Sequence, residues 1–259
     1  MTQNTATEKK SLHRRNSFNK DNLQCIISPC KIFNSDFYDL NYQIYNFWRS
    51  SWTKTFSEID QSFSQTSEEY CRHHKVVSLR YQGEIIACAL LDLFDLHSPI
   101  HKDHKYFLAY PENVFTDFLK LSEKGPVMTV GYLTVDPRFK LQPFIAQLLS
   151  GLVLKYYYST DVQLLITYTR NTKRVNQLAF RFGGIPLAEN LIAFGEPTDF
   201  VYFSQLQYQN LKLHPYYDDF YFFWNERLEI KNDNSLDKLN KRRPNNEKNN
   251  STISLSSNA

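Results

Sequence analysis

The chain has 259 residues, of which 42% are hydrophobic and 22% charged, so it can bury a full core, and we expect a single large domain. Its seven glycines leave few for a nucleotide site built from a glycine-rich loop. Residues 1–31 carry six Lys or Arg against two Asp or Glu, and residues 231–259 carry six against three. The two ends therefore hold +7 and the middle −4, for a net charge of +3. The middle lacks a basic stripe, and we expect no specific nucleic-acid partner.

The cysteines and the apolar runs exclude further classes of protein. The four cysteines, Cys25, Cys30, Cys71 and Cys88, are spaced too irregularly for a disulfide framework or a zinc module, so we expect reduced thiols. No apolar stretch reaches 18 residues, and the first residues do not combine a charged start with an apolar run. We therefore expect no membrane span and no signal peptide, which indicates a soluble cytoplasmic protein.

The two ends of the chain are polar. Residues 1–30 are rich in Asn, Ser, Lys and Thr without periodicity, and from Lys231 onward the chain holds little besides Asn, Lys and Ser. Such segments cannot bury enough apolar surface to offset their ordering entropy. We predict a disordered basic arm over residues 1–34, a folded domain over 35–230 and a disordered tail over 231–259.

The first predicted elements are helices followed by a hairpin. Apolar residues recur at helical spacing over Asp36–Trp52, and Phe56–Phe63 is a candidate for a second, shorter helix. Two β-branched and apolar runs, Val76–Tyr81 and Glu84–Leu91, flank Gln82-Gly83. Two such runs around a glycine indicate a β-hairpin.

Residues 96–125 break this pattern. Pro99 and Pro111 interrupt any continuous helix or strand, although Asn113–Lys120 has helical character. We interpret the segment as an insertion that carries loop structure.

An alternation of strands and helices forms the centre of the predicted fold. Val127–Val135 and Val162–Tyr168 are apolar strands, and Pro143–Ser159 between them is an amphipathic helix. A crossover through a helix returns the chain parallel to the first strand, so we expect a parallel βαβ unit. Gly131, in the middle of the first strand, indicates a bulge or a close approach to the backbone. A second helix is expected over Asn171–Phe182.

Two closing strands and an aromatic helix complete the domain. The predicted strands are the apolar runs Leu191–Phe194 and Phe200–Leu206. An aromatic cluster at Tyr216–Trp224 lies within a helix predicted over residues 214–230. Asp218-Asp219 interrupts the cluster and no Lys or Arg interleaves with it, so it fits a helix packed on the domain better than a base-stacking platform.

Two segments resemble the GCN5-related N-acetyltransferase family. In that family the central strand runs into a Val-x-Pro turn and then an Arg/Gln-x-x-Gly-x-Gly/Ala loop that opens the long helix. Leu133–Leu149 can be aligned with this pattern without a gap: Val135 and Pro137 match, and Lys140 falls on the basic residue of the family. The positions where glycines are usual hold Leu141, Pro143 and Ile145.

The second segment, Asn171–Leu187, resembles the family's Asn-x-x-Ala-x-x-Leu-Tyr-x-x-x-Gly-Phe run. Phe180 or Ala179 stands where many members have the tyrosine that protonates the departing thiolate. Thr129 stands near the position of the carboxylate that many members use as a base. The resemblance therefore carries over neither the acid nor the base.

The resemblance implies a fold and an activity. The expected fold is α/β in the α+β sense, a mixed, splayed β-sheet flanked by helices in one domain. The expected activity is transfer of an acyl group from acetyl-CoA or a longer acyl-CoA to a primary amine of a small molecule or protein. An acyl carrier protein is a further candidate donor, since members without the glycine loop, such as makers of long-chain N-acyl amino acids and acyl-homoserine lactones, often use one.

The resemblance also implies binding residues. Backbone N–H groups at the start of a helix bind the pyrophosphate of coenzyme A, because the donors and the helix dipole both favour an anion. In the family a backbone N–H of the central strand polarises the thioester carbonyl. The implied donor-binding residues are Leu133, Val135, Arg138, Lys140, Phe144, Ile145, Ala146 and Asn171.

Proton transfer has several candidates in the sequence. Tyr132 and Tyr168 are the side chains that we assign to catalysis, with Asp92 or water as alternatives. Positioning of the two substrates is itself worth several kcal/mol, which allows activity without a recognisable base.

The sequence also allows two other sites and one other function. His97, His101 and His104 have the spacing of a metal site on a helix, but Pro99 lies between them, and we expect no metal. Cys71–His74 is a weak candidate for a thiol–imidazole nucleophile, because no third group orients it. The alternative function is a non-catalytic acyltransferase-like binding module, which the missing glycines and tyrosine favour.

Overall fold

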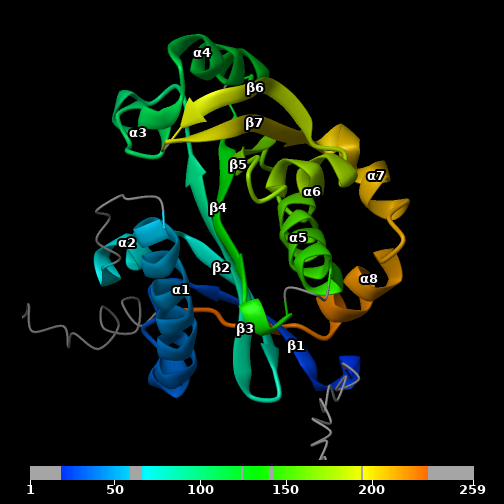
Figure 1. Ribbon diagram of the computed structural model, residues 1–259. Coiled ribbons are helices and arrows are strands. Elements are labelled where there is room, and N and C mark those ends of the chain that lie inside the picture. The colour runs from blue at the N-terminus through cyan, green and yellow to red at the C-terminus, as the bar shows by residue number, and fades with distance from the viewer. Residues whose placement is uncertain (1–18, 59–65, 124, 140–142, 194, 233–259) are drawn as a thin grey trace, which may run out of the picture.

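The computed structural model describes residues 19–58, 66–123, 125–139, 143–193 and 195–232 (Figure 1). An eight-stranded sheet has the order β6-β7-β5-β4-β3-β2-β1-β8. Its strands are β1 (Leu23–Pro29), β2 (Lys75–Tyr81), β3 (Glu84–Phe94), β4 (Val127–Val135), β5 (Leu164–Arg170), β6 (Ile185–Ala193), β7 (Glu196–Ser204) and β8 (Leu228–Glu229).

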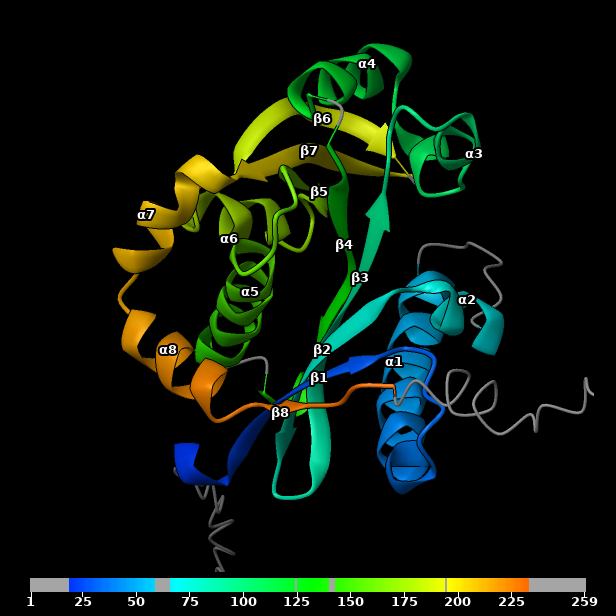
Figure 2. The same ribbon diagram turned by 180° about the vertical axis from the view of Figure 1, so that it is seen from behind.

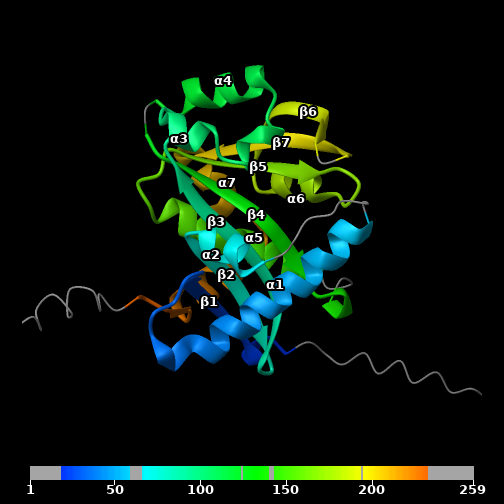
Figure 3. The ribbon, with the colours of Figure 1, turned by 90° about the vertical axis from the view of Figure 1, so that its left-hand side faces the viewer.

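Helices cover both faces of the sheet. Helices α5 to α8 lie over one face and α1 and α2 over the other (Figures 1 and 3). None of the described helices is long and apolar enough to cross a membrane. The helices are α1 (Tyr38–Glu58), α2 (Ser67–Arg72), α3 (Pro99–Lys102), α4 (Glu112–Leu121), α5 (Pro143–Tyr158), α6 (Val175–Arg181), α7 (Tyr208–Lys212) and α8 (Tyr217–Asn225).

The strand directions define a mixed sheet that is splayed in the middle. β1, β2, β3 and β4 pair antiparallel in sequence, and β5, β7 and β6 form a second antiparallel set. The two sets join through β4 and β5, which run parallel but pair only over Val127–Thr129 and Leu164–Ile166. The predicted fold class, a mixed, splayed sheet flanked by helices in one domain, is confirmed.

The prediction of a disordered arm through residue 34 is wrong for its described part. Residues 23–29 form β1, which pairs with β2 on one side and with β8 on the other. Six of its seven residues are buried, and Cys25, Ile26 and Ile27 are at most 1% exposed. The polar composition of the wider segment concealed this short apolar run. Residues 1–18 and 233–259, also predicted to be disordered, lie outside the described residues.

The helices α1, α2 and α6 differ from the prediction. α1 continues to Glu58 because Phe56 turns inward and is buried, so no separate helix begins at Phe56; residues 59–65 lie outside the described residues. α2 was not predicted, and the Thr66 side chain caps its start. α6 begins at Val175 rather than Asn171, because Arg174 adopts a left-handed conformation with φ of 57° immediately before it.

The insertion at residues 96–125 is a packed unit. It holds α3, a short 3₁₀ turn and α4, which confirms the predicted helix there. Phe107, Tyr110 and Phe118 are buried in a second core cluster together with Ile166 of β5 and Phe200 of β7. Figure 2 shows α3 and α4 at the end of the sheet where β6 and β7 lie. The insertion therefore covers the far half of the sheet.

The end of the domain joins its beginning. The predicted aromatic helix is α8, which stops at Asn225, and residues 228–229 form β8 instead of continuing the helix. The side chain of Asn232 accepts a hydrogen bond from Phe33 N and donates one to Lys31 O. The described part of the tail is therefore ordered against the segment that follows β1.

Gly151 allows α5 and α8 to pack closely. A Cβ atom at Gly151 would lie 2.6 Å from Cε1 of Phe220, a distance that side chains do not tolerate. We expect Gly151→Ala to destabilise the protein by about 1–3 kcal/mol in urea unfolding, because overpacking outweighs the better helix propensity of alanine. Gly131→Ala, whose Cβ would meet Tyr106 at 4.0 Å, is the control. Equal stability of the two variants would contradict this packing.

Candidate active site

The centre of the site is a bulge in β4. The pairing of β3 with β4 shifts between Cys88 and Leu90, so that Tyr132 and Leu133 both lie between the partners of these residues. Tyr132 has a φ of 56°, in the left-handed region that costs a non-glycine residue free energy. A strained conformation of this kind persists only where the surroundings impose it, and it is common at functional sites.

Side chains of α1 and α2 impose the conformation of Tyr132. Trp52 Nε1 donates a hydrogen bond to Tyr132 O over 3.1 Å, and the Tyr132 hydroxyl donates one to Glu69 Oε1 over 2.9 Å. The Tyr132 ring packs edge-on against Trp48 and Trp52, at 82° and 89°. The bulge is therefore held at its carbonyl, its ring and its hydroxyl.

The splay between β4 and β5 opens directly before this bulge. Their ladder ends at Thr129 and Ile166, and the next contact is made by a side chain: Thr167 Oγ1 donates to Val130 O over 3.0 Å. From Gly131 to Val135, the edge of β4 that faces β5 has no ladder partner within the described part of the chain. Backbone groups at such an edge are available to a ligand.

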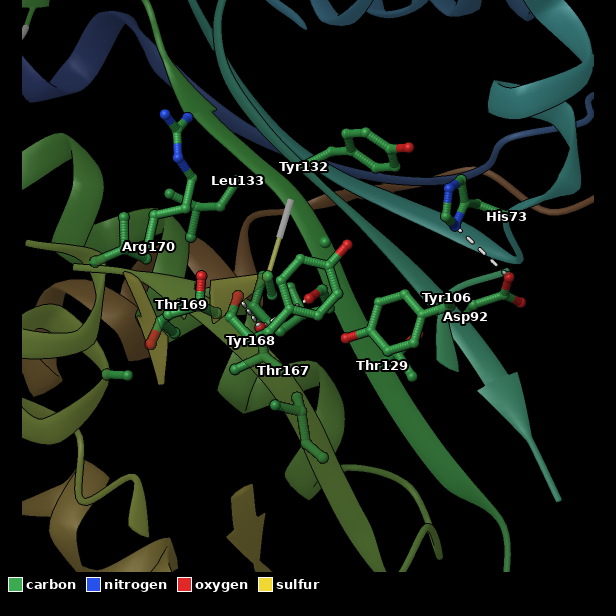
Figure 4. A pocket seen from close by; sticks show the side chains of 18 of the residues that line it. His73, Asp92, Tyr106, Thr129, Tyr132, Leu133, Thr167, Tyr168, Thr169 and Arg170 are labelled. Atoms are coloured by element: carbon green, nitrogen blue, oxygen red, sulfur yellow. Dashed lines mark hydrogen bonds and ion pairs between the residues drawn. The ribbon is translucent and has the colours of Figure 1, made fainter. Parts of the chain in front are cut away.

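A cavity of about 630 Å³ occupies the splay, and its lining comes from both faces of the sheet (Figure 4). One lobe lies against α5 and α6 and is mainly apolar. The opposite mouth lies near α1 and α2 and is polar. The lobe includes Ser150, Val153, Leu154, Leu165, Leu178, Ala179, Phe182 and Phe203; the mouth includes Glu69, Arg72, His73, Asp92, His104 and Lys105.

Glu69 organises the polar mouth. Its side chain is 7% exposed and accepts hydrogen bonds from Lys105, Arg72 and the Tyr132 hydroxyl. Burial alone would raise the pKa of Glu69, but the hydrogen bonds from Lys105 and Tyr132 hold the pKa below its usual value. Glu69 is therefore a carboxylate at neutral pH.

His73 and Asp92 face each other beside Glu69. The His73 side chain is 6% exposed, with Nδ1 at 3.6 Å from Asp92 Oδ2 and Nε2 at 3.8 Å from Glu69 Oε1 (Figure 4). Neither ring nitrogen has a hydrogen-bond partner within the described protein. Burial lowers the pKa of His73 to about 4 and raises that of Asp92 to about 6, because it disfavours both charged forms. His73 is therefore a neutral imidazole.

The structure brings some of the sequence-predicted residues to the cavity. Tyr132, Tyr168 and Leu133 line it, and so does Asp92. Burial raises the pKa of both tyrosines well above its usual value. Val135 lies further along β4, opposite Ala87, and is not among the lining residues.

The residues predicted near the start of α5 that the structure describes do not line the cavity. Arg138 is held by Asp136 at 2.7 Å and by Glu84 at 2.8 Å, and Lys140 lies outside the described residues. Lys20 lies over the Phe144 ring at 4.6 Å. The Ile145 side chain is fully buried and Ala146 is half-buried.

Asn171 takes a structural position. Its Nδ2 donates to Asp199 Oδ1 over 2.8 Å and to Asn190 Oδ1 over 2.9 Å. Asp199 is 2% exposed and also accepts from Asn176 and from the backbone of Asn190. The cluster ties the turn before α6 to β6 and β7.

Sequence reasoning missed most of the polar mouth. Glu69, Arg72 and Lys105 carry no motif, and His73 was noted only beside Cys71, which is exposed and does not line the cavity. The one local signal is the separation of four residues between Glu69 and His73, which places two chemically active groups one helical turn apart.

The histidines weighed in the sequence as a rival metal site, His97, His101 and His104, make other contacts in the structure. His101 Nδ1 accepts a hydrogen bond from Asp95 N over 2.8 Å, while His104 lines the cavity. Among the described residues, no group of three or more His, Cys, Asp or Glu side chains has an arrangement that could hold a metal ion.

The strand order, the splay of β4 from β5 and the bulge agree with the acyl-CoA N-acyltransferase-like fold that the sequence resemblance led us to expect. No family model and no curated protein matches the sequence. Among solved structures, TofI in a ternary complex with an inhibitor and MTA is 12% identical, with 74% of this chain and 98% of that chain covered and a TM-score of 0.49. The acyl-homoserine lactone (AHL) synthase LasI is 13% identical, with 71% of this chain and 90% of that chain covered and a TM-score of 0.48. FeeM, an N-acyl amino acid synthase from uncultured soil microbes, is 12% identical, with 74% of this chain and 96% of that chain covered and a TM-score of 0.46.

Proposed function

We propose that this protein is an N-acyltransferase that moves an acyl group from an acyl thioester to a primary amine by direct attack. The observation that carries the proposal is the splay of β4 from β5 at the bulge, with a cavity lined from both faces of the sheet. A donor entering on the side of α5 and an acceptor entering through the polar mouth would meet at Gly131–Val135. Backbone N–H groups at this unpaired edge are suited to stabilise the oxyanion that forms in acyl transfer.

The chemistry needs a neutral amine. Its nitrogen lone pair attacks the thioester carbon, the C=O electrons move to oxygen, and collapse of the tetrahedral intermediate breaks the C–S bond. The nitrogen gives up a proton and the departing thiolate takes one, so an amide and a free thiol are formed. Holding both substrates in one cavity converts a bimolecular reaction into one within a complex, which is worth about 7–11 kcal/mol of the barrier at best.

The apolar lobe suits a hydrocarbon chain. Its lining by aliphatic and aromatic side chains of α5, α6, β5 and β7 offers few partners for the amides of a pantetheine arm but matches an acyl tail. We therefore favour a donor with an acyl chain longer than acetyl, carried by coenzyme A or by an acyl carrier protein.

The donor's phosphate end would lie at the start of α5. The backbone amides of Phe144, Ile145 and Ala146, at the first turn of α5, would donate to an anion there with the helix dipole behind them, and Pro143 has no N–H to contribute. Arg138 and Lys140 are the neighbouring cations in the sequence, and Leu133 and Val135 would pair with the pantetheine arm through their backbone. Asn171 would act indirectly, through the turn before α6.

The test is donor binding followed by turnover. We expect the melting temperature of the full chain to rise more with decanoyl-CoA or a decanoyl carrier protein than with acetyl-CoA or coenzyme A. A mixture of primary amines with the binding donor should then release free thiol and form a decanoyl amide, detected by mass spectrometry. No shift with any of the four would refute the donor assignment. A shift without amide would indicate the non-catalytic acyl-binding alternative.

A further inference from the structure

The His73 imidazole is a buried polar group without a partner inside the cavity. A buried polar group normally finds a hydrogen bond, and leaving it unpaired costs about 1–3 kcal/mol. Both nitrogens of His73 lack one, although the ring faces a cavity that could hold a donor or acceptor. The Tyr132 ring fixes it edge-on, with centroids 5.5 Å apart at 80°. The imidazole is therefore oriented and unused in the protein alone.

We propose that His73, oriented by Asp92, is the proton acceptor for the amine in acyl transfer, an inference that rests on the proposed function. His73 reaches the cavity from the segment between α2 and β2. Asp92 reaches it from β3, where it lies opposite Thr129, the last residue of β4 that pairs with β5. Both line the same mouth as the cations Arg72 and Lys105. An amine that entered through this mouth would pass the imidazole before reaching the bulge.

Two carboxylates close to His73 act against the burial that keeps its imidazole neutral. The groups that face it are Glu69 and Arg72 from α2, Asp92 from β3, His104 and Lys105 from the insertion, and Tyr132 from β4. Carboxylates stand 3.6 Å and 3.8 Å from its two nitrogens, so a proton gained on either side acquires an anionic neighbour. Arg72 and Lys105 oppose the charge but are neutralised in part by Glu69.

The two tyrosines predicted for this role fit it less well. The Tyr132 hydroxyl already donates to Glu69, and both that bond and burial keep its proton in place. The Tyr168 hydroxyl is also held protonated by burial. Neither phenol is a base at neutral pH, although either could supply a proton to the leaving thiolate.

The protons of the amine, His73 and the thiolate balance in this reaction. An alkylammonium gives one proton to the His73 imidazole and becomes the neutral nucleophile. After attack, the nitrogen loses a second proton as the amide forms, the thiolate takes up one proton, and the proton on His73 returns to solvent. One ammonium and one thioester thus yield one amide, one thiol and one proton.

The experiment separates a base from a structural histidine by the acceptor used. Propylamine is protonated at neutral pH and needs a base, whereas hydroxylamine is already neutral. With the decanoyl thioester that raises the melting temperature, we expect His73→Gln to lower kcat/KM for propylamine about 10²–10⁴-fold and that for hydroxylamine only a few-fold. Asp92→Asn should show the same split to a smaller degree. His74→Gln, at the exposed neighbouring histidine that does not line the cavity, should change neither.

Each outcome is decisive. Equal losses with both amines in His73→Gln, at an unchanged thermal shift by the donor, would show that the imidazole is only structural and overturn the inference. Unchanged activity with both would overturn it as well. If the unmodified protein transferred the acyl group to neither amine although the donor bound, the proposed function would fail, and the inference with it. If His73→Gln failed to fold, the split in Asp92→Asn would decide: a preferential loss with propylamine supports the pair, and no preference refutes it.

Discussion

Asp92→Asn is expected to stabilise the protein by about 2–3 kcal/mol at pH 8 while it slows acyl transfer to an alkylamine. Burial raises the pKa of Asp92 from 3.8 to about 6 in the folded state. Each pKa unit corresponds to about 1.4 kcal/mol, so ionising this carboxyl in the folded protein costs about 3 kcal/mol more than in the unfolded chain. Asparagine removes the charge and keeps an oxygen that can accept the hydrogen bond from Leu93 N, now 3.0 Å from Asp92 Oδ1.

The sign of the pH dependence identifies the cause. Well below 3.8, the pKa of this carboxyl in the unfolded chain, the group is protonated in both states and carries no penalty. The penalty grows as the pH rises through 3.8 towards 6 and levels off above that, so the advantage of Asp92→Asn should be small at about pH 3 and full at about pH 8. Urea unfolding at both pH values measures this. Asp117→Asn, at an exposed carboxylate on α4, is the control. An equal effect of Asp92→Asn at both pH values would show that the buried charge is not the cause.

Filling the apolar lobe is expected to shorten the acyl chain that the protein accepts. Ala179 of α6 is a small side chain in the lining of the lobe, and phenylalanine there would occupy space that we assign to the acyl tail. Each methylene excluded from an apolar site costs about 0.8 kcal/mol, so a donor displaced by four methylenes should lose about 3 kcal/mol, or about 10²-fold in kcat/KM. A hexanoyl donor should lose far less than a dodecanoyl donor.

The comparison is made as a ratio within each variant. Competition between hexanoyl and dodecanoyl thioesters cancels differences in folding and in active fraction. Gln177→Phe adds the same ring to the exposed side of α6 and should leave the ratio unchanged. A uniform loss with both donors in Ala179→Phe would refute the placement of the tail, since it would indicate damage to α6 instead.

The central strands and the long helix could be predicted from the sequence because their signals are local. The boundaries of β4 at Val127 and Val135 coincide with the prediction, since Pro126 and Asp136-Pro137 flank one apolar run. β1 was missed because its seven residues lie in a polar neighbourhood and are ordered only by pairing with β2 and β8.

The site could be predicted only in its backbone. Gly131 indicated an irregularity in β4, and the bulge lies at the next two residues. Apart from Asp92, the polar mouth could not be predicted, since Glu69 and Lys105 come from separate elements and meet only in the tertiary structure. Asn171 shows the converse: a position matched to a family motif whose side chain is used here to hold Asp199.

The pairing of β1 with β8 also sets an order for synthesis. β1 is completed early, but the edge that β8 covers stays open until about 200 further residues have left the ribosome, as the bond between Asn232 and Phe33, 199 residues apart, illustrates. An uncovered apolar edge is a template for pairing with other chains. Among the described residues, β8 is the strand that pairs with this edge of β1, at Ile26 and Ile27, so a nascent chain stalled before residue 228 should be prone to aggregate.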